Sequence, residues 1–150
     1  MNTIKHTAEF EIEQPVAALF PLFSPEGEKL WVPEWDYENI MGTTTLSEDY
    51  VFLTKSHDHA STEAIWLVKR YKPEDYRVQY YKVEPEDKVG IVTVECVEQG
   101  ASRTCVRVAY EYIALADKGR HFIETFTAEA YQDFIAEWKT LLLRYYGDPR

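Results

Sequence analysis

Long hydrophobic runs and positive charge are both scarce in this sequence. No stretch approaches the roughly 20 apolar residues that a transmembrane helix needs, and the N-terminal sequence MNTIKHTAEF lacks the apolar core of a signal peptide. Sixteen basic residues stand against 26 acidic ones, which gives a net charge of −10. Such a surface repels phosphate backbones and anionic lipid, so we expect neither nucleic-acid nor membrane binding.

Cysteine is also scarce, and familiar catalytic motifs are absent. Two cysteines without an export signal predict a protein of the reducing cytoplasm. The sequence has no G-x-S-x-G, no Gly-rich phosphate loop and no H-E-x-x-H motif, so no catalytic residue can be named from it, and no cofactor is predicted. His57 and His59 suggest a metal site, but no further ligand is evident, and a solvated turn without metal is the better prediction.

Aromatic residues, by contrast, are abundant. They make up 15% of the chain, with 4 Trp, 11 Tyr and 7 Phe. Aromatic side chains fill cores efficiently and also line concave binding sites, so this excess is compatible with either use. A chain of 150 residues is long enough to bury a sizeable core, and we predict a single domain over residues 1–150.

The most regular predicted element is a C-terminal helix over residues 119–146. Apolar residues recur there at steps of three and four, which is one face of a helix. The stripe consists of Ile123, Phe126, Ala130, Phe134, Trp138, Leu141 and Tyr145. A helix with such a stripe must lie on a broad apolar surface, so we expect it to pack on a sheet.

Most of the remaining chain predicts β-strands. The predicted strands are residues 4–12, 50–55, 60–71, 76–83, 89–97 and 103–114. Two short helices, residues 16–23 and 26–30, follow the first strand, with Ser24 as the cap of the second and Pro25 at its first position. The expected fold class is α+β: a curved antiparallel sheet wrapped around one long helix.

The last predicted hairpin allows a test of register. If Val94 and Val108 share the inner face, the numbers of opposed residues have an even sum, and the connecting loop has an odd length that suits a bulged turn containing Gly100. In that register Cys96 and Cys105 face opposite sides of the sheet. A disulfide between them is therefore not expected, and both are predicted to be reduced and structural.

Several local sequences resemble the START-like superfamily, also called SRPBCC. They are FEI at 10–12 through PV at 15–16 and LF at 19–20, LFSPEGE at 22–28 through LWVPEWD at 30–36, VFLT at 51–54, IW at 65–66 and RY at 70–71. The later stretches look like an uncharacterised bacterial branch, and the resemblance covers essentially the whole chain. Members of this superfamily include polyketide cyclases, plant pathogenesis-related allergens, lipid-transfer domains and chaperone ATPase activators.

This resemblance implies a helix-grip fold with a cavity between the sheet and the C-terminal helix, roofed by the two short helices. Nine residues that alternation, the helical stripe or proximity to the cavity mouth would place there are the candidate ligand-binding residues. They are Trp31, Trp35, Phe52, Trp66, Tyr80, Tyr110, Phe126, Ala130 and Phe134. The inward aromatic residues among them also fit plain core packing, and Trp31 and Trp35 also fit pinning an irregular segment to the core.

His6 alternates inward on the first strand and is the one histidine with a plausible cavity position, although a lone inward histidine is usually a satisfied core residue. The favoured function is binding of a small hydrophobic or aromatic molecule in this cavity. A cyclase- or dehydratase-type enzyme that uses the same cavity is the alternative, and an interaction module like the chaperone ATPase activators is a third. Both a monomer and a homodimer fit the sequence.

Overall fold

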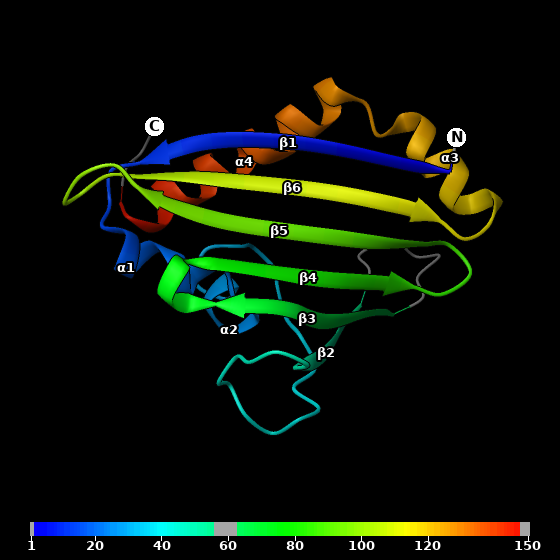
Figure 1. The fold of residues 1–150 in the computed structure, drawn as a ribbon, viewed down its shortest axis with the longest axis horizontal. Coiled ribbons are helices and arrows are strands. Elements are labelled where there is room, and N and C mark those ends of the chain that lie inside the picture. The colour runs from blue at the N-terminus through cyan, green and yellow to red at the C-terminus, as the bar shows by residue number, and fades with distance from the viewer. Residues whose placement is uncertain (1, 56–62, 148–150) are drawn as a thin grey trace.

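The computed structural model describes residues 2–55 and 63–147, and within them an antiparallel sheet of six strands carries the helices on one face (Figure 1). The strands lie in the spatial order β1-β6-β5-β4-β3-β2. Their bounds are β1 Thr3–Ile12, β2 Val51–Thr54, β3 Ala64–Lys72, β4 Arg77–Glu84, β5 Lys88–Glu98 and β6 Thr104–Ala114, and a short 3-10 turn, η2 (Pro73–Asp75), joins β3 to β4. The predicted α+β helix-grip architecture is confirmed.

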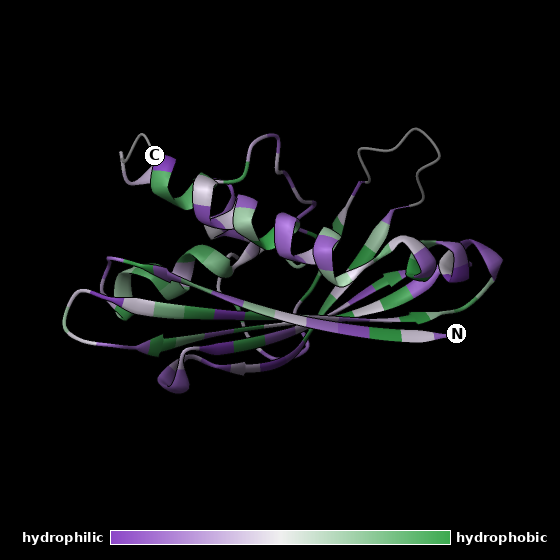
Figure 2. Ribbon diagram, turned by 90° about the horizontal axis from the view of Figure 1, so that it is seen from above, coloured by the Kyte–Doolittle hydropathy of each residue, from purple (hydrophilic) through white to green (hydrophobic). Residues whose placement is uncertain are grey.

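Alternation along the strands separates a buried face from an exposed one. Figure 2 shows hydrophilic and hydrophobic residues interspersed along the strands. In β5 and β6 the even-numbered side chains face inward, and Val94 lies opposite Val108 in the predicted register. Cys96 and Cys105 are both free and buried, on opposite faces of the sheet. Burial raises the pKa of Cys96 to about 12, so that this thiol stays protonated and unreactive.

The two short helices that the sequence predicts after β1 are present, with one difference. The first begins as α1 (Val16–Leu19) and continues as a 3-10 turn, η1 (Phe20–Phe23), because Pro21 lacks the N–H that a continuing α-helix uses. The second, α2 (Pro25–Glu28), is capped as expected, since Ser24 Oγ accepts the Gly27 N–H at 2.9 Å. Both α1 and η1 contact β5 and so cover the inner face of the sheet.

The predicted C-terminal helix is in fact two helices, α3 (Asp117–Thr125) and α4 (Ala128–Tyr145). Phe126 leaves helical geometry (φ −85°, ψ 66°), and Thr127 starts α4 as its N-cap. This break changes the helical phase, so a single stripe cannot run through both helices. The buried residues of α4 are Tyr131, Ile135 and Leu142. The stripe drawn through Ala130 and Phe134 was wrong in phase: Ala130 is exposed, and Phe134 is 41% exposed.

Replacing Thr127 with alanine tests this break. The Thr127 Oγ1 accepts the Ala130 N–H at 3.1 Å, and the loss of such a cap costs about 1 kcal/mol of stability. Urea unfolding should show this loss for Thr127→Ala. Thr125→Ala is the control: it lies two residues away, is equally exposed, and donates only to the Phe122 carbonyl of its own helix. Equal stability of the two variants would contradict a helix start at Thr127.

Helix α4 lies across the β1 side of the sheet and packs against β1 (Figures 1 and 2). Beneath it the Trp138 ring lies 6.0 Å from Phe23 and 5.7 Å from Trp31. The Tyr131 hydroxyl donates to the Val108 carbonyl at 2.7 Å, which ties α4 directly to β6. In the described part of the chain, no helix is long and apolar enough to cross a membrane.

Candidate functional site

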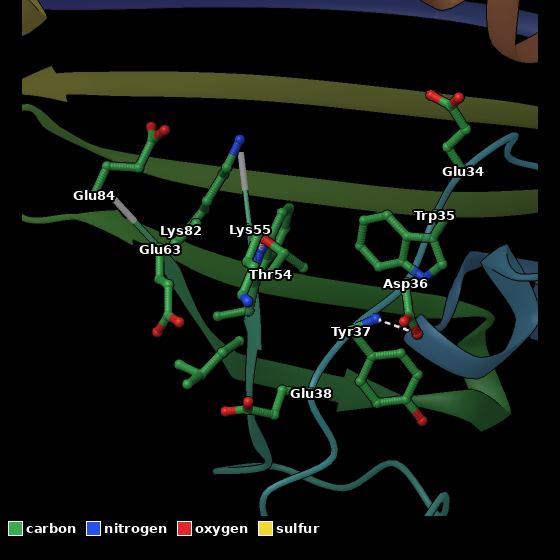
Figure 3. Close-up of a pocket in the computed structure, with 13 residues that line it drawn as sticks. Glu34, Trp35, Asp36, Tyr37, Glu38, Thr54, Lys55, Glu63, Lys82 and Glu84 are labelled. Atoms are coloured by element: carbon green, nitrogen blue, oxygen red, sulfur yellow. Dashed lines mark hydrogen bonds between the residues drawn. The ribbon is translucent and has the colours of Figure 1, made fainter. Parts of the chain in front are cut away.

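A pocket of about 730 Å³ lies at the β2–β4 end of the sheet, between these strands and residues 34–38 (Figure 3). Its lining consists of Glu34, Trp35, Asp36, Tyr37, Glu38, Leu53, Thr54, Lys55, Glu63, Ala64, Trp66, Lys82 and Glu84. None of these described lining residues belongs to α3 or α4. The sequence-based prediction placed the cavity between the sheet and the C-terminal helix. The pocket instead lies toward the opposite edge of the sheet, because α4 packs on β1.

Two tryptophans form the aromatic wall of this pocket. The rings of Trp35 and Trp66 meet edge to face with centroids 6.4 Å apart, and Trp66 stacks on Phe52 at 5.6 Å. Trp66 Nε1 donates to Thr54 Oγ1 at 2.9 Å, and Trp35 Nε1 donates to the Pro25 carbonyl at 2.8 Å. Because both indole N–H groups are satisfied within the protein, the rings are held in place and can offer a guest only their apolar surfaces.

The rest of the lining is strongly charged. Five side chains are acidic and two are basic: Glu34, Asp36, Glu38, Glu63 and Glu84 against Lys55 and Lys82. The excess of carboxylates opposes the entry of an anion and tolerates a neutral or positively charged guest. A second hollow of about 770 Å³ lies on the other face of the sheet, near Thr7, Thr93 and Arg107, but its described lining has no aromatic residue. The first pocket is therefore the better candidate site.

Lys82 and Glu84 extend into this pocket from the same face of β4 (Figure 3). Part of the Lys82 side chain is accessible from the pocket, yet protein surrounds it on nearly all sides, and this burial lowers the pKa of Lys82 against the opposing effect of Glu84. Lys88 Nζ lies 3.1 Å from Glu84 Oε2. The contact is an ion pair without hydrogen-bond geometry, so among the described residues this buried oxygen has no hydrogen-bond donor.

A further titratable carboxyl, that of Glu28, lies on α2 and is half-buried. After burial, which is the largest cause, the charge of Glu28 raises the pKa of Tyr80, and it contributes likewise at Tyr110. Desolvation by the surrounding protein is the sole cause that raises the pKa of Glu28 itself, to about 8. The group is therefore mostly protonated at neutral pH, which is the state expected of a proton donor.

Of the nine predicted ligand-binding residues, Trp35 and Trp66 line the pocket, and Phe52 supports Trp66 from behind. The other six do not line it: Trp31, Tyr80, Tyr110, Phe126, Ala130 and Phe134. For Ala130 the reason is the shifted phase of α4, which leaves it exposed. The alternative interpretation, core packing, describes most of the rest.

The hydrogen bonds of these core aromatics explain their placement. Trp31 is buried and its Nε1 donates to the Leu22 carbonyl at 2.7 Å, so it pins the segment after α2 to the core. The Tyr80 hydroxyl likewise donates to the Phe23 carbonyl at 2.8 Å. Tyr110 is buried 5.5 Å from the Phe134 ring, and Phe126 packs 5.1 Å from Tyr112 at the α3–α4 junction.

His6 is also a structural residue. Its Nε2 lies 2.7 Å from the Phe126 carbonyl, to which it donates, and its ring stacks on Tyr131. It thereby joins β1 to the junction between α3 and α4. Within residues 2–55 and 63–147, no group of three or more His, Cys, Asp or Glu side chains is arranged to hold a metal ion. The predicted turn at His57 and His59 lies outside the described residues.

Sequence reasoning missed Lys82, Glu84 and Glu28. On β4 the adjacent Tyr80 and Tyr81 made the inward face ambiguous, and with it the direction of Lys82 and Glu84. The pairing of Val78 with Val94 settles it, since these two valines are buried and share their face with Lys82. Glu28 had no signal, because a helix as short as α2 has too few residues to show a period.

Comparisons with known proteins place the fold. No protein-family model matches the sequence, and no curated protein matches it in sequence. Among solved structures, a major latex-like protein of Panax ginseng superposes with a TM-score of 0.70 at 17% identity, over 95% of this chain and 96% of that one. The Zhui aromatase/cyclase of Streptomyces sp. R1128 gives a TM-score of 0.68 at 13% identity, over 99% and 96% of the two chains.

Norcoclaurine synthase from Thalictrum flavum, solved with dopamine and hydroxybenzaldehyde, is similar too. Its TM-score is 0.67 at 14% identity, over 95% of this chain and 87% of that one. Identities this low establish a shared fold and leave the ligand of this chain to be argued from its own residues.

Proposed function

We propose that this chain, which has the helix-grip fold of the START-like superfamily, binds a small aromatic molecule in the pocket beside Trp35 and Trp66. The observation that carries the proposal is a pocket of suitable volume with an aromatic wall. A space of about 730 Å³ falls within the range of small-molecule sites, roughly 300–1,000 Å³. An aromatic guest would complete the edge-to-face and stacked series that already runs through Trp35, Trp66 and Phe52.

The charges of the pocket narrow the class of guest. Its acidic majority disfavours carboxylates, phosphates and sulfates, because each would enter against carboxylate repulsion. The two indole N–H groups are already bonded within the protein, so the aromatic wall offers no polar contact. We therefore infer an aromatic molecule without negative charge that carries a polar group able to reach Lys82 or a carboxylate.

Calorimetric titration with 2-naphthalenemethanol and with 2-naphthoate tests the proposal. The neutral alcohol is expected to bind at least about fivefold more tightly than the anion, since one unfavourable charge contact is worth about 1 kcal/mol or more. Trp66→Leu keeps an apolar side chain but removes the ring, and should weaken binding of the alcohol about tenfold.

Phe134→Leu is the matched control. Phe134 is an aromatic side chain that the sequence placed in the cavity, but it lies on α4 and does not line the pocket. Its replacement should leave the affinity for the alcohol unchanged. If Phe134→Leu weakens binding and Trp66→Leu does not, the guest lies under α4 and the proposed site is wrong. Tighter binding of the anion would contradict the proposed ligand class.

An enzymatic use of the same pocket is the second candidate. The specific observation in its favour is that the lining is far from wholly apolar and contains a titratable amine, Lys82, whose pKa burial lowers. Perturbed titratable groups in a pocket are typical of catalytic sites, although structural ion pairs perturb pKa values as well. Whether Lys82 reacts with a bound molecule therefore decides whether the pocket only binds its ligand or also acts on it.

A further inference from the structure

Lys82 occupies an unusual position for a lysine, in the middle of an inner-face row of aromatic side chains. Across the sheet this row reads Trp66, Lys82, Gly90, Tyr112. Gly90 leaves room beside Lys82: a Cβ there would lie 2.9 Å from Cε1 of Tyr112 and 3.6 Å from Cβ of Lys82. The stem of Lys82 thus lies between the Trp66 ring and the Tyr112 ring that leans over Gly90.

The amine at the end of this stem differs from that of the neighbouring lysine. Lys88 is buried and paired, with Nζ 3.1 Å from Glu84 Oε2 and 3.5 Å from Asp87 Oδ1. Lys82 Nζ makes no ion pair with any described residue and lies 5.4 Å from the centroid of the Trp66 ring. Burial, and then the charge of Lys88, lower the pKa of Lys82, while Glu84 and Asp87 act in the opposite direction. More of its amine is therefore unprotonated at neutral pH than in an exposed lysine.

We propose that Lys82 Nζ is a nucleophile that forms an imine with the carbonyl group of an aromatic aldehyde or ketone bound in this pocket, an inference that rests on the proposed function. The three requirements of the reaction meet there. Lys82 lines the pocket, the Trp35 and Trp66 rings orient an aromatic carbonyl compound, and Glu84 extends from the same face of β4 as a proton carrier.

The chemistry balances without a co-reactant. The nitrogen lone pair forms a C–N bond as the carbonyl π electrons move to oxygen, and a proton passes from nitrogen to that oxygen through Glu84, which gives a carbinolamine. The C–O bond then breaks as the C=N bond forms, and the second proton of the amine leaves with the oxygen. The products are one imine and one water, so that neither oxidation nor reduction takes place.

Reductive trapping in the wild-type protein tests the proposal. The protein is incubated at pH 7 with 2-naphthaldehyde and sodium cyanoborohydride, and the rate of adduct formation at each lysine is read by peptide mass spectrometry. Lys55 lines the same pocket but is exposed, and is the internal control. Lys82 is expected to react severalfold faster than Lys55, because burial lowers the pKa of Lys82 and the Trp35 and Trp66 rings hold the aldehyde beside it.

The same experiment provides a second measurement, the dependence of the trapping rate on pH. The rate at Lys82 should reach half its maximum at lower pH than the rate at Lys55. The titratable groups that face Lys82 in this profile are Glu84 on its own strand, Asp87 and Lys88 at the β4–β5 turn, and Glu63 and Lys55 across the pocket. In Lys82→Arg, whose fold is checked by circular dichroism, the fast adduct should disappear.

The outcomes separate this inference from the proposed function. If 2-naphthalenemethanol, which has no carbonyl group, binds and Lys82 is trapped first, both stand. If the alcohol binds but trapping is no faster at Lys82 than at Lys55, the imine is wrong and the binding function remains. If the alcohol does not bind, the proposed function fails, and this inference fails with it.

Discussion

Replacing Gly119 with alanine is expected to lower the free energy of unfolding by about 3 kcal/mol. Gly119 is a buried residue in the first turn of α3, and a Cβ there would lie 2.1 Å from the Asp87 carbonyl oxygen and 3.2 Å from the Ala114 Cα. Both are backbone atoms, so no change of rotamer relieves the clash. The Asp87 carbonyl also accepts the Leu115 N–H at 2.8 Å, which holds the β4–β5 turn against the start of α3. The helix or the turn must therefore move.

The sign of this effect is diagnostic. By helix propensity alone, a change from glycine to alanine inside a helix stabilises by about 1 kcal/mol. Glu124→Ala, on the exposed side of the same helix, is the control and should change stability by no more than about 0.5 kcal/mol. Urea unfolding of the two variants measures the difference. A stabilised Gly119→Ala protein would show that α3 does not pack on this turn.

The strands and their register were predictable because alternation is a local signal. Each residue of β6 faces the opposite side from its neighbour, so Val106, Val108 and Tyr110 identify the inner face without knowledge of any partner. The break before α4 was not predictable in this way. Phe126 and Ala130 fit the helical spacing across the break, although Phe126 and Thr127 lie between the two helices and belong to neither. A pattern of apolar residues three and four apart therefore does not reveal that the helix is interrupted and that a second helix begins in a different phase.

The pocket could not be predicted for a different reason: one of its walls is irregular. Residues 34–38 have no period, and tertiary contacts place them: the Glu38 N–H donates to the Leu53 carbonyl at 2.8 Å, and Trp35 Nε1 donates to the Pro25 carbonyl. These contacts bring Trp35 to Trp66. Composition could identify both tryptophans as candidates, but only the tertiary contact shows that they share a wall while Trp31 belongs to the core.

The second large effect is a loss of stability with rising pH that originates at Glu28. The folded protein holds the Glu28 pKa at about 8, against an ordinary value of 4.5 that applies to the unfolded chain. Between these two values the unfolded state has released its proton and the folded state has kept it. Unfolding therefore releases a proton, and its free energy falls as the pH rises through this window. Below about pH 4.5 both states are protonated and the effect vanishes.

Glu28→Gln removes this dependence, because the amide resembles the protonated carboxyl but cannot ionise. We expect the variant to match the wild type at pH 4 and to be more stable at pH 8.5 by about 2–4 kcal/mol, a range discounted for the accessible part of the side chain. Urea unfolding at several pH values measures the difference in stability between the two proteins. The contributions of all titratable groups that both proteins share cancel in this difference. Glu13→Gln, an exposed residue in the turn after β1, controls for the loss of one negative charge and should shift stability little at any pH. If the curves of Glu28→Gln and wild type run parallel from pH 4 to 8.5, Glu28 is solvated and is not protonated at neutral pH.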